Sequence, residues 1–87
     1  MLNQQQLVWQ CRRGVRELDV LLGRFLQTNS DTGTSAYNQL DSQGKEAFER
    51  LLKVQDPIIM DWLFGKAESE DQGVADIIKR LQALSGL

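Results

Sequence analysis

Histidine is absent from this chain of 87 residues, and cysteine and proline each occur only once. Without histidine, the chain lacks the commonest general base and the commonest metal ligand of proteins. The single cysteine, Cys11, has no partner for an internal disulfide or a cysteine–histidine pair, and a lone thiol suits a reducing cytoplasm. The seven glycines are scattered, so no phosphate-binding loop is present. These absences predict a protein that is not an enzyme and holds no metal.

Long apolar runs are also missing, and none approaches the length that spans a bilayer. The first six residues have neither the basic-then-apolar order of a secretion signal nor the arginine-rich order of an organellar one. We therefore expect a cytoplasmic protein with no membrane insertion. The net charge of −2 is uneven, because residues 1–27 carry four arginines against two carboxylates and residues 28–87 carry six basic against ten acidic side chains. Such a chain is a poor non-specific nucleic-acid binder, and its small basic region better suits an acidic protein partner.

Apolar residues recur at spacings of three and four along five segments, which is typical of helices that face a shared core. We predict helices over residues 4–11, 15–27, 42–54, 56–64 and 71–84. The predicted fold is all-α, a compact bundle of about five short helices that forms a single domain over residues 1–87, and we expect a monomer. The predicted core consists of Leu18, Leu22, Phe48, Leu51, Leu52, Ile59, Leu63, Ile77, Ile78 and Leu81.

Helix start signals support these boundaries. Asn3 and Gln6 have the spacing of a capping box, with Leu2 and Leu7 placed as a hydrophobic staple around it. Asp41 or Ser42 is expected to cap the third helix, and Asp56 the fourth, with Pro57 in its first helical position. Ser69 with Gln72 suggests a second capping box at the start of the last helix, whose apolar stripe extends to Leu84.

Three further segments have less regular patterns. Residues 28–35 read as a polar loop that does not pack and is flexible, followed by a turn that brings Tyr37 and Leu40 onto the core. Met60 and Phe64 widen the apolar face of the fourth helix, so we expect that helix to be central, with Gly65 ending it. Trp9 is expected to be a partly buried packing residue.

The densest charge cluster lies between the first two predicted helices, in Cys11-Arg12-Arg13-Gly14-Val15-Arg16-Glu17-Leu18-Asp19. Glycine is unfavourable inside a helix and suits a turn, so we predict a sharp turn that displays the charges. The alternative is an ordinary solvated helix start. The candidate partner-binding residues are Arg12, Arg13, Gly14, Arg16, Glu17 and Asp19.

Each of these residue types has a physical role in binding. Arginine guanidinium groups grip carboxylates or carbonyls of a partner, and Gly14 allows close approach of a partner's backbone. Glu17 lies four residues after Arg13, so the two pair if the helix extends back that far.

This cluster resembles the Arg-Gly-x-x-Glu signature of the succinate dehydrogenase assembly factors, with Arg13, Gly14 and Glu17 at the matching positions. Further segments fit the same family: Phe48-Glu49-Arg50-Leu51-Leu52, then Asp56-Pro57, then Trp62-Leu63. The resemblance covers about residues 9–84. Gln55 and Gly44 depart from it, since the family often has acidic residues at those two positions.

The resemblance implies a five-helix bundle that binds the flavoprotein subunit of succinate dehydrogenase and promotes covalent attachment of FAD to that client. Fumarate reductase flavoproteins are a second implied client. The histidine that takes up the flavin belongs to the client, so the factor itself is expected to bind no cofactor tightly and to handle FAD only transiently with the client.

Three alternatives remain from the sequence. Some members of the family are also described as antitoxins, which leaves an antitoxin-like protein-binding regulator. Two helices joined at a glycine-containing turn also resemble a helix-turn-helix nucleic-acid binder, although only Arg16 and Arg24 supply basic groups along the second helix. A small metabolic enzyme is the third alternative.

Overall fold

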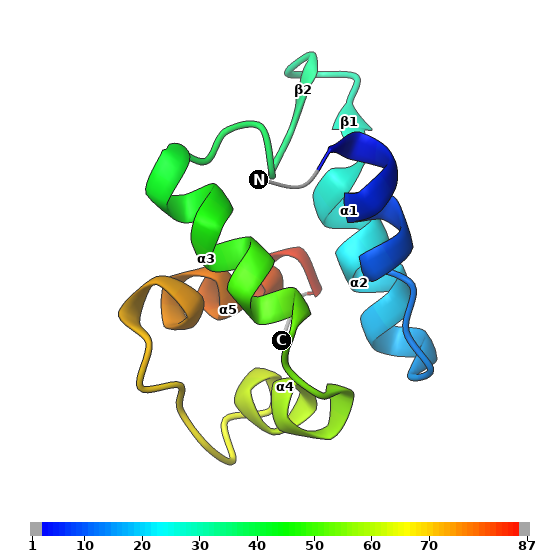
Figure 1. The fold of residues 1–87 in the computed structure, drawn as a ribbon. Coiled ribbons are helices and arrows are strands. Elements are labelled where there is room, and N and C mark those ends of the chain that lie inside the picture. The colour runs from blue at the N-terminus through cyan, green and yellow to red at the C-terminus, as the bar shows by residue number, and fades with distance from the viewer. Residues whose placement is uncertain (1–2, 86–87) are drawn as a thin grey trace.

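The computed structural model describes residues 3–85, which form five helices and one pair of very short strands (Figure 1). The elements in chain order are α1 (Gln4–Gln10), α2 (Arg16–Leu26), β1 (Thr28–Asn29), β2 (Thr34–Ser35), α3 (Ser42–Leu52), α4 (Asp56–Leu63) and α5 (Gln72–Ser85). The predicted all-α class is confirmed, and the predicted helix ends agree within two residues.

The C-terminal helix α5 is the centre of the packing, because it contacts α2, α3 and α4 (Figure 1). Between these helices, the rings of Phe25 and Phe48 stack with centroids 4.9 Å apart, and Tyr37 packs against Phe48 at 5.4 Å. All ten predicted core residues are buried. The buried stripes therefore meet in one apolar cluster that fixes the positions of the helices.

Helix α1 begins with the predicted capping box. The side chain of Asn3 accepts from the backbone N–H of Gln6 at 2.9 Å, and the side chain of Gln6 accepts from the backbone N–H of Asn3 at 3.0 Å. Leu7 is buried against the core, whereas the proposed staple partner Leu2 lies outside the described residues. An isolated seven-residue helix is marginal in water, so its cap and its buried side are both needed.

The polar segment after α2 is more ordered than predicted. Strands β1 and β2 pair antiparallel. Ser35 is only 2% exposed, and its hydroxyl accepts the backbone N–H of Asn38 at 3.1 Å. Tyr37 donates its backbone N–H to the carbonyl of Phe25 at 3.1 Å. The prediction that this loop does not pack is therefore wrong at Ser35, although residues 28 and 30–33 are exposed. The predicted burial of Tyr37 and Leu40 is confirmed.

The start of α4 differs from the predicted cap. The capping position is Gln55, without a side-chain cap bond, and Asp56 is already helical. The carboxylate of Asp56 instead meets the guanidinium group of Arg13. Gly65 has a φ of +76° directly after the helix, which confirms the predicted end, since glycine adopts this left-handed conformation without steric penalty.

Helix α4 is less central than its composition predicted. Only Ile59 and Leu63 are buried, whereas Ile58 is 45% and Phe64 is 55% exposed. The apolar residues surround the helix, but its neighbours cover only one side of it, with Met60 partly buried at the edge.

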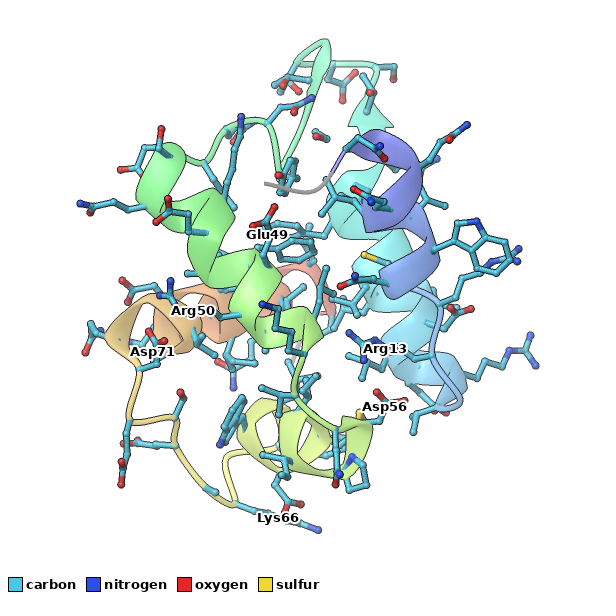
Figure 2. All side chains as sticks on the ribbon, in the orientation of Figure 1. Arg13, Glu49, Arg50, Asp56, Lys66 and Asp71 are labelled. Atoms are coloured by element: carbon cyan, nitrogen blue, oxygen red, sulfur yellow. The ribbon has the colours of Figure 1, made fainter. Side chains whose placement is uncertain are left out.

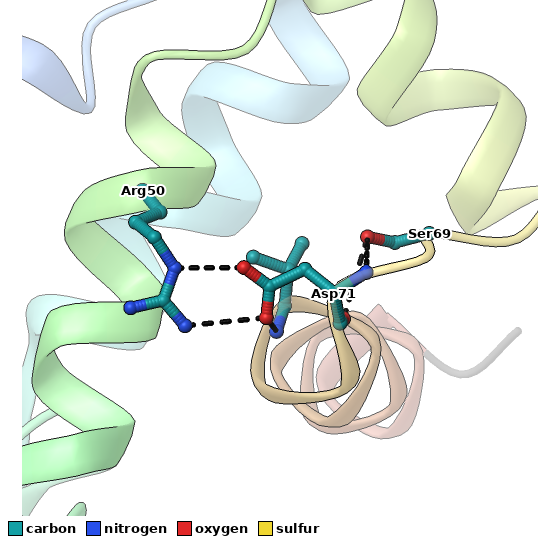
Figure 3. A network of polar contacts seen from close by, with 4 residues as sticks. Arg50, Ser69 and Asp71 are labelled. Carbon is teal, nitrogen blue, oxygen red and sulfur yellow. Dashed lines mark hydrogen bonds and ion pairs between the residues drawn. The ribbon is translucent and has the colours of Figure 1, made fainter.

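Asp71, and not the predicted pair of Ser69 and Gln72, organises the start of α5. The Asp71 carboxylate accepts the backbone N–H of Val74 at 3.2 Å, while Ser69 accepts the backbone N–H of Asp71 at 3.1 Å. Figure 3 shows Arg50 of α3 gripping the same carboxylate through two nitrogens, at 2.7 and 3.2 Å. The hydrogen bonds from Arg50 and from the backbone N–H of Val74 lower the pKa of the Asp71 carboxyl group.

The far end of α5 also departs from the prediction. Leu84 is 40% exposed, although it continues the apolar spacing of the helix. Within residues 3–85, no helix is both long and apolar enough to cross a bilayer.

Candidate functional site

The segment 11–15 connects α1 to α2 and is called here the α1–α2 turn. Its two ends are anchored, since Cys11 is 4% exposed and Val15 packs partly buried against the core. Between them, Arg12 and Gly14 are exposed. The predicted sharp turn with displayed charge is thus present, although only some of its charged groups face solvent.

Arg13 turns inward from this segment. Its side chain is 12% exposed, and it donates from Nη1 to Asp56 Oδ1 at 3.3 Å and from Nη2 to the carbonyl oxygen of Leu52. Figure 2 shows Arg13 and Asp56 facing each other between the α1–α2 turn and the start of α4. Helix α2 begins only at Arg16, so the predicted pair of Arg13 with Glu17 does not form. Arg13 therefore ties the turn to the α3–α4 junction.

Asp19 has a similar structural role. This partly buried carboxylate in the first turn of α2 accepts the backbone N–H of Arg13 at 3.0 Å. Helix α2 has no side-chain cap of its own, so Asp19 reaches back and fixes the chain that enters the helix. Backbone and side chain of Arg13 are thus both held, which gives the exposed part of the turn a defined shape.

Gly14 lies in open space. A Cβ atom built on Gly14 would meet nothing within 4 Å, and its φ lies outside the left-handed region that favours glycine. Neither the packing nor the backbone of this chain therefore requires glycine at this position. The two exposed charged residues after it, Arg16 and Glu17, continue the same surface onto α2.

The six predicted partner-binding residues thus divide into two groups. Arg13 and Asp19 hold the turn in place from within, and the other four are exposed: Arg12, Gly14, Arg16 and Glu17. Contact of any of the six residues with a partner stays a prediction.

Trp9 extends this surface, contrary to expectation. Its side chain is 68% exposed on α1, and the guanidinium carbon of Arg12 lies 5.4 Å from the centre of the ring. This cation–π contact holds Arg12 beside the indole. No sequence pattern predicts the outward position of Trp9, because one aromatic residue on a seven-residue helix does not define a face.

Burial suppresses the nucleophilic character of Cys11. Burial raises the pKa of its thiol to about 11, and the nearby Asp19 carboxylate adds to the increase, while Arg13 opposes it. The thiolate is the reactive form of cysteine, so this side chain is a neutral core residue at pH 7. Across residues 3–85, no group of three histidine, cysteine, aspartate or glutamate side chains is arranged to hold a metal ion.

Comparison with known proteins identifies the family. The family model described as "Flavinator of succinate dehydrogenase" matches residues 5–85, which include the α1–α2 turn and nearly all of the five helices. This chain belongs to that flavinator family. The Arg-Gly-x-x-Glu resemblance is therefore confirmed at the level of the family.

Relatives of the flavinator family from several bacteria are similar over most of their length. The FAD assembly factor SdhE of Coxiella burnetii is 37% identical over 84 residues, which cover 97% of this chain and 94% of the relative. The FAD assembly factor SdhE of Methylococcus capsulatus is 37% identical over 86 residues, with 99% and 95% covered. That of Colwellia psychrerythraea is 40% identical over 70 residues, with 80% and 69% covered.

Proposed function

We propose that this chain is an assembly factor that binds the flavoprotein subunit of succinate dehydrogenase and promotes covalent attachment of FAD to it. Membership of the flavinator family supports the reaction and the client. The place of contact is supported by the open position of Gly14, which nothing within the chain requires to be glycine. Close approach of a partner's backbone would explain the glycine, because any side chain at this position would hold the partner away.

The proposed role is that of a non-catalytic helper. The chain has no histidine to take up the flavin, and its single thiol stays protonated at neutral pH. A helper of this kind accelerates a reaction by binding one conformation of its client more tightly than the others. The two groups that become joined, a histidine and FAD, are both held by the client, so this chain is not consumed.

The exposed charges give this binding its chemistry. Arg12 and Arg16 present planar donors to carboxylates or carbonyl oxygens of the client, and Glu17 presents an acceptor beside them. Arg13 and Asp19 position that surface through their contacts within the chain. We further propose that the factor acts as a cytoplasmic monomer, that fumarate reductase flavoprotein is a second client, and that FAD is handled only together with the client.

The test is covalent flavin fluorescence of the client subunit in a denaturing gel, after co-expression with each variant in cells that lack their own factor. Gly14→Arg and Glu17→Ala are expected to abolish the fluorescence gained with the unaltered chain. Gly23→Arg is a matched control, because Gly23 is also exposed and equally open but lies on α2 away from the turn. Glu70→Ala is the corresponding control for an exposed carboxylate.

Circular dichroism of the purified variants separates loss of function from loss of fold. Normal flavin attachment with both folded turn variants would exclude the α1–α2 turn as the contact surface. If Gly14→Arg and Glu17→Ala instead unfold the protein while Gly23→Arg does not, the turn is a structural element.

A further inference from the structure

A hollow of about 380 Å³ lies between α2 and α4, beside the α1–α2 turn, and is called here the α2–α4 groove. One wall is formed by α2 with Arg16, Val20 and Arg24. The other is formed by Met60 of α4 and by Phe64 directly after that helix, and Ser85 at the end of α5 also lines the groove. Arg16, Val20 and Arg24 are four residues apart and so follow one side of α2, and further lining residues such as Leu21 and Leu63 lie between the two walls' named residues in sequence. The surface inside the groove is mainly apolar.

The groove leaves large apolar side chains exposed to water. Val20 is 45% and Phe64 is 55% exposed, although both sit beside the buried core of a small domain. Single exposed apolar residues are common on protein surfaces, but apolar residues that converge on a concave site mark a place where another molecule binds.

Charge at the two ends of the groove indicates what that molecule carries. Arg16 and Arg24 are both exposed, and neither forms an ion pair with another residue in the described part of the chain. They are eight residues apart on α2, which corresponds to about 12 Å along a helix axis. Among residues 3–85, Glu17 is the only carboxylate that lines the groove, so the described arginines are in excess there.

A second copy of this chain does not fit well. A symmetric dimer formed groove to groove would bring the Arg16 and Arg24 pairs of the two copies together. Like charges facing each other across an interface oppose binding. The complementary occupant is instead an apolar segment flanked by carboxylates.

We propose that the α2–α4 groove receives an amphipathic segment of the client flavoprotein subunit, whose apolar side chains pack on Val20 and Phe64 and whose carboxylates meet Arg16 and Arg24. This inference rests on the proposed function, and it extends the contact surface beyond the turn. The two surfaces are continuous, because Arg16 and Glu17 belong to both of them. The carboxylates would be about eight residues apart on a helix, or about four apart on an extended strand.

The first experiment measures the dissociation constant between the purified chain and the purified client subunit. Phe64→Ser and Arg24→Glu are each expected to raise it by about tenfold or more, since each removes a central contact of the groove. Ile58→Ser is the matched apolar control on α4, with 45% exposure and a position outside the groove. Lys79→Glu is the matched charge reversal, on an exposed residue of α5 that does not line the groove. Both controls are expected to stay within about twofold of the unaltered chain.

The second experiment identifies the occupant. A photo-crosslinking benzoylphenylalanine in place of Phe64 is expected to capture a client segment that contains carboxylates, whereas the same group in place of Ile58 captures none. Replacing those carboxylates by lysine is then expected to restore binding to the Arg24→Glu variant.

The outcomes separate the two proposals. If the unaltered chain binds the client and the groove variants bind equally well, the groove proposal is overturned while the proposed function stands. If the unaltered chain fails to bind the client at all, both are overturned. If position 64 captures a second copy of this chain, the groove is a dimer contact and the client proposal for it is wrong.

Discussion

The ion pair between Arg13 and Asp56 joins two residues that are 43 positions apart, with 3.3 Å between Nη1 and Oδ1. The same guanidinium group also donates to the carbonyl oxygen of Leu52 at the end of α3. The turn that carries the exposed charges is thereby fixed to the junction of two other helices. A binding surface on a rigid support loses less conformational entropy when a partner docks.

Removing either partner of this ion pair is expected to destabilise the fold. Arg13→Ala or Asp56→Ala should lower the free energy of unfolding by about 3 kcal/mol, because each leaves the other charge partly buried and unpaired. Arg12→Ala, one residue away and exposed, should change it by less than about 0.5 kcal/mol. Urea denaturation of the three variants provides the measurement, and equal midpoints for Arg13→Ala and Arg12→Ala would contradict the assigned role of Arg13.

Truncation in the shared core should have a comparable effect. Leu22→Ala and Ile78→Ala are expected to cost roughly 2–5 kcal/mol each, from lost burial and the cavity left behind. Leu84→Ala is the matched control, because Leu84 lies on the same stripe of α5 as Ile78 but is 40% exposed. Thermal denaturation should therefore rank Leu84→Ala well above the other two variants, and similar midpoints for Ile78→Ala and Leu84→Ala would disprove this packing.

Two glycines should respond oppositely to alanine. Gly14 has no strained backbone angle and open space around it, so Gly14→Ala should leave stability unchanged or raise it by about 0.5 kcal/mol by restricting the unfolded chain. Gly65 has a φ of +76°, so Gly65→Ala should lower stability by about 1 kcal/mol. Chemical denaturation of both variants decides the matter, and a large loss with Gly14→Ala would mean that glycine is needed by the fold itself.

Alkaline pH should weaken the fold through Cys11. Its pKa is about 11 in the folded chain against an ordinary value of 9.0, so the protonated thiol is favoured by folding. The resulting stability is fully present below pH 9 and is lost as pH rises from 9 towards 11. The free energy of unfolding should therefore fall more steeply between these pH values in the unaltered chain than in Cys11→Ala. Parallel curves for the two proteins would show that this thiol ionises equally in the folded and unfolded states.

Local patterns in the sequence were sufficient for most of the fold. The capping box of Asn3 and Gln6 and the stripes that contain Leu18, Leu22 and Ile77 depend on residues a few positions apart, and they were predicted correctly. The direction of Arg13 was not predictable in this way, because its partners Asp56 and Leu52 are brought to it only by the tertiary fold.

Exposure was harder to predict than periodicity. The apolar residues of α4 lie on all sides of the helix, so their pattern does not indicate which of them are buried. In the structure, Ile58 and Phe64 remain exposed. The outward position of Trp9 has the same origin. Both errors concern large apolar side chains on the surface, which is where contact with a partner is expected.

The burial of Cys11 also has a practical consequence. Cys11 is the chain's only cysteine, and its thiol is buried and protonated at neutral pH. The unaltered protein therefore reacts little with thiol-directed labels. Gly23→Cys, on the exposed part of α2 outside both the α1–α2 turn and the groove lining, would supply the single fast-reacting group. A dye attached there would report the arrival of another molecule in real time, with no need to remove the native cysteine first.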